Sequence, residues 1–88
     1  MRYKPDCDAL AATLADGAVL LNLRTNRYHS LNETGARVWQ LLVEARSEDE
    51  IVAALVTEYD VSEKIARQET ISIIAALQAA QLIVSHDH

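Results

Sequence analysis

Two tight-turn signals near the start of the chain constrain its fold more than any other feature. Asp16-Gly17 lies between apolar segments, and a type I′ hairpin turn requires residues that tolerate positive φ at both central positions. Arg24-Thr25-Asn26 gives a second turn, in which we expect Asn26 to adopt the left-handed conformation. A strand bounded by two such turns pairs with the strand on each side. We therefore predict a three-stranded antiparallel meander.

The third strand of this meander has the composition of an open edge. The three strands are predicted at Leu10–Leu14, Ala18–Leu23 and Arg27–Leu31. Alternation along the second strand puts Val19, Leu21 and Leu23 on one face. Natural edge strands use proline, bulges or inward charges to prevent pairing, but the third strand has no proline and only Arg27 is charged. We predict that its outer edge accepts an added peptide strand.

Three helix-start signals follow the strands. Asn32 and Ser62 are predicted N-caps of the first and third helices, and Ser47 with Glu50 forms a capping box for the second. The helices are predicted to end near Glu44, Tyr59 and Ala80. We expect the apolar segment Leu82–Val84 to fold back onto the core.

The element order is therefore β-β-β-α-α-α. It predicts an α+β fold that is winged helix-turn-helix-like, with a three-stranded antiparallel sheet followed by three helices. We expect a single domain over residues 1–88, with its core at about residues 10–84. The common DNA-binding version of this fold places its wing after the helices, whereas the sheet here precedes them.

The charge of the chain argues against nucleic acid as a partner. Its net charge is −5, with thirteen acidic residues against eight Lys and Arg, and nucleic-acid binding needs a basic surface. No apolar run reaches the roughly 18 residues of a transmembrane helix, so we expect no membrane partner. The N-terminal residues lack the apolar region of a signal peptide, and Cys7 is the single cysteine. Together these features predict a cytoplasmic protein.

Candidate catalytic and metal-binding groups are few. Cys7, His29, His86 and His88 are the soft metal ligands, and their spacing matches no zinc-binding pattern. His29 directly precedes Ser30, so the two side chains point to opposite faces of a strand and cannot form a catalytic pair. Phosphate-binding glycine loops and nucleophile elbows are absent from the sequence. We expect no catalytic residue, no metal site and no cofactor, and predict that the chain is not an enzyme.

The third helix carries more apolar surface than one core-facing stripe requires. The positions concerned are Ile65, Thr70, Ile71, Ile73, Ile74 and Leu77. The surplus predicts either a groove beside the third strand or a seal over Leu82–Val84, and the pattern alone weighs these two equally. A homodimer contact is a further alternative. Arg67 is interpreted either as a partner of Glu63 one turn away or as an anchor for an acidic peptide side chain.

Three aromatic side chains need separate interpretations. Tyr28 and His29 fit either ordinary surface packing on an edge strand or contacts to a bound peptide, one from each face. Trp39 lies within an apolar stripe and is predicted to be in the core.

Three segments together resemble the PqqD-like family, the recognition elements for precursors of ribosomally made, post-translationally modified peptides. They read DGAVLLNLRTNRYHSLNETGARVWQLL, SxxEIVAALxxEYDV and ARQETISIIAALQAAQLI. The resemblance covers roughly residues 10–84, and the order and spacing of the motifs carry it rather than any single motif. Its carriers include Asp16-Gly17, Arg27-Tyr28, Leu31-Asn32, Gly35-Ala36-Arg37 with Trp39, and the closing Leu82-Ile83.

The resemblance implies a domain that binds a leader peptide as an added strand, in a groove between the third strand and the third helix. Matched by position, it assigns the strand contacts to Arg27, Tyr28, His29, Ser30 and Leu31. It assigns the helix contacts to Arg67, Thr70, Ile71 and Ile74. The chain departs from the family pattern, where Gly or an aromatic is common, at Asn26, His29, Ser30 and Gln81, which puts the side-chain preference of the pocket in doubt.

Within the family, the chain looks most like the small recognition subunit of lasso-peptide systems. That subunit works beside a separate cysteine protease, which removes the leader, and a cyclase. The PqqD of pyrroloquinoline quinone synthesis, which serves a radical SAM enzyme, is less similar. A winged-helix DNA-binding regulator is a further alternative, but Lys64 and Arg67 on the third helix are neighboured by Glu63 and Glu69. We expect a monomer or a weak dimer.

Overall fold

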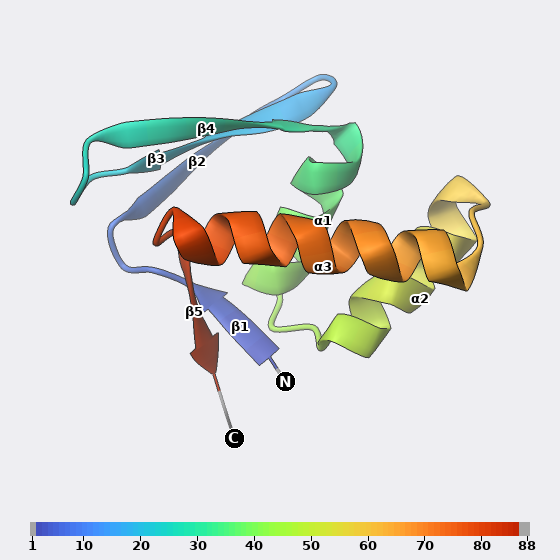
Figure 1. Ribbon diagram of the computed structural model, residues 1–88. Coiled ribbons are helices and arrows are strands. Elements are labelled where there is room, and N and C mark those ends of the chain that lie inside the picture. Colours follow the sequence, from blue (N-terminus) through green and yellow to red (C-terminus); the bar gives the residue numbers. More distant parts are fainter. Residues whose placement is uncertain (1, 87–88) are drawn as a thin grey trace.

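The computed structural model describes residues 2–86 and confirms the α+β fold with a three-stranded sheet followed by three helices (Figure 1). The strands of the main sheet are β2 (Ala9–Leu14), β3 (Gly17–Asn22) and β4 (Arg27–Asn32). The helices are α1 (Glu33–Val43), α2 (Glu48–Tyr59) and α3 (Glu63–Ala79). Two further strands, β1 (Arg2–Pro5) and β5 (Ile83–His86), lie at the ends of the described chain.

The main sheet has the order β2-β3-β4 and is antiparallel throughout. The face of β3 that packs on the helices carries Ala18, Leu20 and Asn22, all buried. Val19, Leu21 and Leu23 do share the other face, as predicted, but that face is only partly covered and Leu23 is exposed. The most hydrophobic face of this strand is therefore not its core face.

The β2–β3 turn differs from the predicted type I′ geometry. Leu14 pairs with Gly17, so Ala15 and Asp16 are the two turn residues, and neither Asp16 nor Gly17 has a positive φ. Gly17 is needed for another reason, because a Cβ at this position would collide with the carbonyl oxygen of Leu31 on β4. The second turn is as predicted, since Asn26 adopts the left-handed conformation with a φ of 58°.

All three predicted helix caps are confirmed. The Asn32 side chain accepts a hydrogen bond from the Gly35 N–H at 2.8 Å. Ser47 and Glu50 form the reciprocal capping box, with distances of 3.2 and 2.8 Å. The Ser62 hydroxyl accepts from the Ile65 N–H at 3.2 Å. Because each cap fixes where the backbone turns into a helix, all three helices begin where the sequence predicted.

The core lies between the inner face of the sheet and the three helices. Its fully buried large side chains include Leu20, Val38, Leu42, Ile51, Leu55, Leu77 and Leu82. Trp39 is buried, as predicted. Among the residues that the structure describes, no helix is both long and apolar enough to span a bilayer.

A second sheet, which the sequence analysis did not predict, joins the two ends of the chain. β1 and β5 pair antiparallel, with Tyr3 opposite Ser85 (Figure 1). Tyr3 and Ile83 are buried in the core, which confirms the expected return of the chain after α3. Val84, which was predicted to turn inward with its neighbours, is exposed.

Candidate functional site

The outer edge of β4 is open. β4 pairs with β3 along one edge, and no strand in residues 2–86 pairs with the other. Every residue of β4 except Leu31 is exposed. The ends of the chain could have covered this edge, but β1 and β5 pair with each other instead. The open edge predicted from the sequence is thus present in the fold.

The register shows which backbone groups of β4 face outward. The Leu23 N–H bonds to Asp8 beside β2, whereas the carbonyl of Asn22 points toward β4 and accepts from Asn26. In an antiparallel strand, the backbone N–H and C=O groups of successive residues point alternately toward the strands on its two sides. Since Asn22 pairs with Arg27 and the pattern repeats every second residue, the backbone groups of Tyr28 and Ser30 face the open edge. These two residues offer unpaired donors and acceptors for an added strand.

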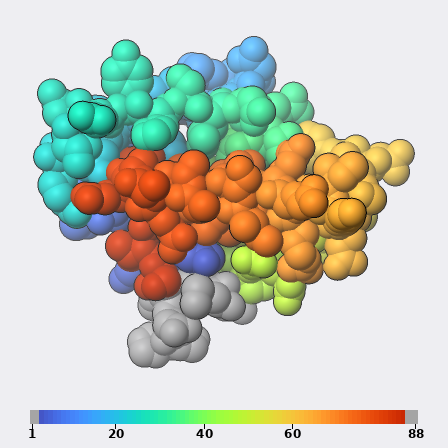
Figure 2. Space-filling model, in the orientation of Figure 1, coloured from blue at the N-terminus to red at the C-terminus, as the bar shows by residue number. Residues whose placement is uncertain are grey.

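A groove runs between β4 and α3, and we call it the β4–α3 groove. β4 packs mainly on β3 and α1, whereas α3 packs mainly on α2, α1 and β5. One end of the groove is a hollow of about 670 Å³, lined by Thr25, Arg27, His29, Ala76, Ala79, Ala80 and Gln81. The other end is a hollow of about 310 Å³, lined by Asn32, Gln68, Glu69, Ser72 and Ile73. Figure 2 shows the teal surface of β4 lying along the orange surface of α3.

The predicted strand residues divide between the two faces of β4. Arg27 and His29 line the groove, because their partners on β3 are the inward-facing Asn22 and Leu20. Tyr28 and Ser30 have side chains on the outer face, and Tyr28 is 71% exposed. Leu31 is partly buried and packs against the core. An added strand would therefore meet Arg27 and His29 on its inner face and Tyr28 on its outer face.

The predicted helix residues lie elsewhere on α3. Thr70 and Ile74 are only 0% and 3% exposed, so they belong to the core and are closed to a peptide. Arg67 faces α2, where it lies 3.3 Å from Glu48 and 3.1 Å from Asp49. Hydrogen bonding to Asp49, and then to Glu63, raises the pKa of the Arg67 guanidinium. Ile71 follows Arg67 by one turn and lies on the same side of the helix, away from the groove.

The groove face of α3 is instead made of small and polar side chains. It carries Gln68, Glu69, Ser72, Ile73, Ala76 and Ala79. Of these, only Ile73 belongs to the helical wall predicted from the sequence. Small residues leave space beside a strand without adding hydrophobicity, so this face carries no apolar surplus in the sequence. The repeat of Ser72, Ala76 and Ala79 at helical spacing was the available signal.

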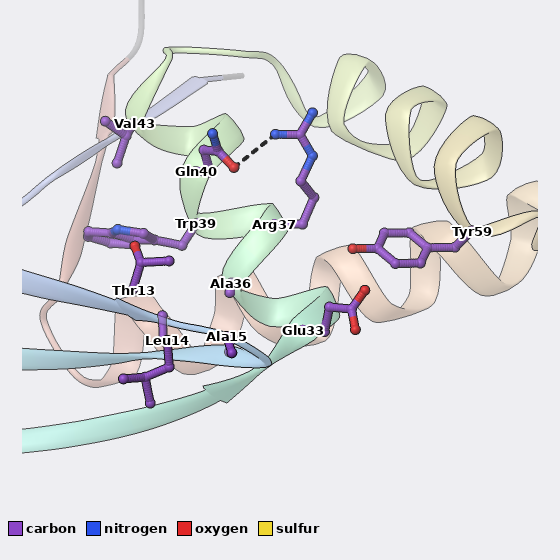
Figure 3. Close-up of a pocket in the computed structure, with 12 residues that line it drawn as sticks. Thr13, Leu14, Ala15, Glu33, Ala36, Arg37, Trp39, Gln40, Val43 and Tyr59 are labelled. Atoms are coloured by element: carbon purple, nitrogen blue, oxygen red, sulfur yellow. Dashed lines mark hydrogen bonds between the residues drawn. The ribbon is translucent and has the colours of Figure 1, made fainter.

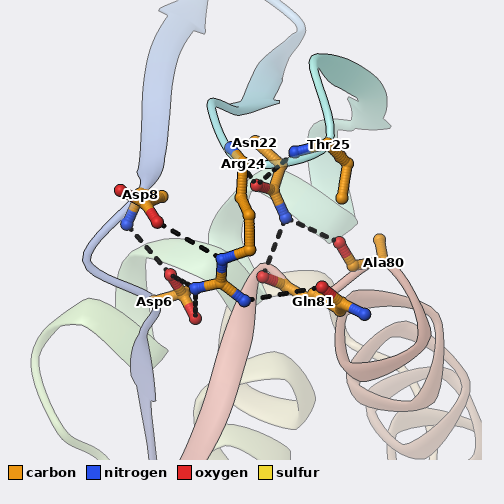
Figure 4. Close-up of polar contacts among 7 residues, drawn as sticks. All are labelled: Asp6, Asp8, Asn22, Arg24, Thr25, Ala80 and Gln81. Carbon is orange, nitrogen blue, oxygen red and sulfur yellow. Dashed lines mark hydrogen bonds and ion pairs between the residues drawn. The ribbon is translucent and has the colours of Figure 1, made fainter.

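A polar network fixes one end of the groove (Figure 4). The buried Asn22 amide donates to the carbonyl oxygens of Ala80 and Gln81, both at 3.0 Å. Its side-chain oxygen accepts from the backbone N–H groups of Arg24 and Thr25 at 2.9 and 3.3 Å. The β3–β4 turn is thereby bound to the C-terminal end of α3, which sets the distance between the two walls.

Arg24 extends this network to the segment between β1 and β2. Its guanidinium lies 2.7 Å from Asp6 and 3.3 Å from Asp8. The Asp8 backbone N–H and then Arg24 hold the pKa of Asp6 below its ordinary value. Asp6, Cys7 and Asp8 also bring three potential metal-ligand atoms within 4.8 Å of one another. Because both carboxylates bind Arg24, the cluster is best described as an ion-pair site.

A separate hollow of about 410 Å³ lies between the β2–β3 hairpin and α1, with Tyr59 of α2 at its rim (Figure 3). Neither β4 nor α3 contributes to its lining. Arg37 points into it but is bound to Glu58 at 2.8 Å and to Gln40 at 3.0 Å. Burial, with nearby Glu33 and Glu58, raises the pKa of Tyr59. The cation of this hollow is thus already neutralised by the chain itself.

Comparison with known proteins gives a consistent result. Residues 17–83 match the family described as Coenzyme PQQ synthesis protein D (PqqD). The solved structure of TbiB1 in complex with the TbiA(beta) leader peptide is 30% identical to this chain, with a TM-score of 0.88 over 97% of this chain and 99% of that one.

A second solved structure supports the fold alone. It is lasso peptide synthetase B1 complexed with the leader peptide, which is 24% identical, with a TM-score of 0.87 over 97% of this chain and 100% of that one. No curated protein sequence matches the chain significantly.

Proposed function

The chain belongs to the PqqD family, and from this membership we propose that it binds the leader region of a ribosomally synthesised precursor peptide. The leader adds as a strand to the open edge of β4 and lies over the β4–α3 groove. The chain then presents the precursor to separate enzymes, a leader peptidase and a cyclase of a lasso-peptide pathway. Residues 1–88 act as one binding domain without catalysis.

The observation that carries this proposal is the open edge of β4 beside a groove. Exposed edges are normally protected, because unpaired backbone groups recruit other chains. Here the backbone of Tyr28 and Ser30 is unprotected, and the facing helix is lined by small side chains. Such an arrangement is suited to strand addition, in which the backbone gives affinity and alternate side chains give specificity.

The energetics indicate what the leader must contain. Ordering an unfolded peptide costs about 1–2 kcal/mol per residue. Each strand hydrogen bond returns a net of roughly 1 kcal/mol. Burial of apolar side chains must supply the rest, at about 25 cal/mol per Å². We therefore expect the leader to need at least one apolar anchor in the groove, held beside Ile73 and Ala76.

Two other functions fit less well. A DNA-binding regulator needs a basic helix, whereas Arg67 on α3 is bound by three acids and the chain carries a net charge of −5. A PqqD-type chaperone for a radical SAM enzyme would use the same strand addition. The likeness to TbiB1, which was solved with a leader peptide, supports leader binding. The fold shared with lasso peptide synthetase B1 supports the lasso-peptide assignment.

The proposal is tested with a pair of proline variants. In Ser30→Pro, the proline replaces an N–H on the open edge of β4, so the sheet retains its own hydrogen bonds. In Ala11→Pro, it replaces an N–H on the outer edge of β2, the opposite edge of the sheet. Both variants should stay folded, and only Ser30→Pro should lose binding of a synthetic leader from the precursor encoded beside this chain.

Backbone-amide NMR during the same titration supplies the second measurement. In the wild-type chain, leader binding should shift the amide signals of Tyr28 and Ser30 and slow their hydrogen exchange. Amides on the outer edge of β2 should not change. A folded Ser30→Pro variant that binds the leader with wild-type affinity would exclude strand addition to β4.

A further inference from the structure

Arg27 differs from the other arginines whose side chains the structure describes. Each of the others lies within ion-pair distance of at least one acid: Arg24, Arg37, Arg46 and Arg67. Within residues 2–86, no acidic side chain pairs with Arg27. The chain carries a net charge of −5, yet of the arginine side chains that the structure describes this one lacks an acidic partner, at the mouth of the wider end of the β4–α3 groove.

Two structural roles for Arg27 can be considered first. It could neutralise the negative end of the α3 dipole, but the terminal carbonyls of Ala80 and Gln81 already accept hydrogen bonds from Asn22. It could also protect the edge of β4 against pairing with other chains. A charge of either sign hinders pairing at an edge, so edge protection alone does not require a cation at this end of the groove.

The opposite end of the groove carries an opposite charge. Glu69 lines the narrower hollow with Asn32, Ser72 and Ile73, and no basic side chain in residues 3–85 pairs with it. Between the two ends, the groove face of α3 is uncharged and includes Ser72, Ile73 and Ala76. The groove is therefore neutral in its middle, with a free cation at the start of β4 and a free anion near its end.

We propose, on the basis of the proposed function, that this charge order selects the direction and register of the leader. Because the sheet is antiparallel throughout, an added antiparallel strand starts near Glu69 and ends near Arg27. The leader then carries a basic side chain toward Glu69 and, further along, an acidic side chain toward Arg27. Groove-facing side chains recur every second residue, which places the two charges about four residues apart.

Backbone hydrogen bonds alone do not fix the direction or the register of an added strand. An added strand can pair in either direction, and a slip of two residues restores the same hydrogen-bond pattern and the same inward face. Charges at the two ends of the groove disfavour reversed and slipped complexes. Exposed ion pairs are weak, so each should change affinity only about two- to fivefold. The charges thus set geometry, while the apolar anchor supplies most of the affinity.

Peptide selection tests the proposal without a known precursor. The full chain is used as bait for a displayed library of random peptides, alongside the variants Arg27→Glu and Glu69→Lys. Wild-type binders should carry a basic residue before an acidic one. Arg27→Glu should replace the preferred acid with a base, and Glu69→Lys should replace the preferred base with an acid. Lys4→Glu, an exposed position on β1, and Asp16→Lys, in the β2–β3 turn, are matched charge controls and should leave the preference unchanged.

A charge swap then gives the decisive comparison. One selected peptide and its version with the two charges exchanged are titrated against the wild-type chain and the Arg27→Glu/Glu69→Lys double variant. The wild-type chain should prefer the original by about fivefold or more, and the double variant should prefer the exchanged peptide. Equal affinities in both proteins would overturn the charge inference.

The Ser30→Pro variant separates the failure of this inference from that of the proposed function. Binding that is lost in Ser30→Pro but insensitive to charge contradicts the charge order and leaves strand addition intact. Binding that survives in Ser30→Pro, or a wild-type chain that selects no peptide, contradicts both.

Discussion

Asn22 connects the sheet to α3 through both halves of its side-chain amide. It is 2% exposed, donates to two carbonyl oxygens and accepts from two backbone N–H groups. Asn22→Asp keeps the shape but removes the donors and sets a carboxylate against the carbonyls of Ala80 and Gln81. Leaving buried polar groups without partners should lower the free energy of unfolding by about 2 kcal/mol or more, as measured in urea.

Asn32→Asp is the matched control for this substitution. This substitution makes the same chemical change at a helix N-cap, where asparagine and aspartate are equally favourable acceptors. Its free energy of unfolding should stay within about 0.5 kcal/mol of wild type. Equal effects of the two substitutions would show that Asn22 does not hold α3 to the β3–β4 turn.

At single residues, the sequence predicted best what depends on local chemistry. The caps Asn32 and Ser62 and the left-handed Asn26 follow from hydrogen bonding within a few residues, and all three are confirmed. Burial is a property of the whole fold. Thr70, which is polar, is fully buried, whereas Ile71 next to it is exposed. Residue type alone therefore could not identify the groove face of α3.

At the scale of elements, the two glycines distinguish contacts that can adjust from contacts that cannot. A Cβ on Gly17 would collide with the Leu31 carbonyl oxygen, a backbone atom fixed by the β3–β4 pairing. A Cβ on Gly35 in α1 would lie 3.2 Å from the Leu31 Cβ and 3.3 Å from the Asn32 Oδ1, contacts that a shift of a few tenths of an ångström relieves. Gly17→Ala should lower the free energy of unfolding by about 2 kcal/mol.

Gly35→Ala serves as the control, because alanine gains about 1 kcal/mol over glycine in a helix and this offsets the tighter contact. Its free energy of unfolding should change by less than about 1 kcal/mol. The displacement of β4 in Gly17→Ala should also weaken leader binding, measured in the same titration as for Ser30→Pro. If the two alanine variants are equally stable, β4 is not held as close to β3 as the structure indicates.

Elements with strong local signals were predicted, and those that depend on distant pairing were not. The meander and the three helices follow from turns and caps. β1 and β5 pair residues from opposite ends of the chain, and each has only four residues. A strand this short carries no alternation that distinguishes it from a loop. The predicted type I′ turn was wrong because Gly17 was assigned to backbone conformation, whereas it is required by close packing.

At the scale of the whole molecule, the chain ends close the core on the side away from the groove. In Figure 1, β1 and β5 lie below α3, while β4 lies above it. The terminal sheet, formed by β1 and β5, and the proposed leader site thus lie on opposite sides of the fold. A small domain buries a limited fraction of its surface, so the terminal sheet should be essential to folding although it lies outside the proposed leader site.

Substitutions of two tyrosines test whether stability and leader binding depend on opposite sides of the fold. Tyr3 on β1 is 7% exposed and packs in the core, whereas Tyr28 on β4 is 71% exposed beside the open edge. Tyr3→Ala removes a buried ring and should lower the free energy of unfolding by about 3 kcal/mol, a large share of the 5–15 kcal/mol typical of domains. Tyr28→Ala should leave stability within about 0.5 kcal/mol, yet weaken leader binding severalfold because a cross-strand contact is lost. Urea unfolding gives the free energy of unfolding of each variant, and leader titration at a temperature where both are folded gives the leader affinity of each. If Tyr3→Ala weakens binding as much as Tyr28→Ala does, the terminal sheet and the groove are coupled, and the separation of the two sides fails.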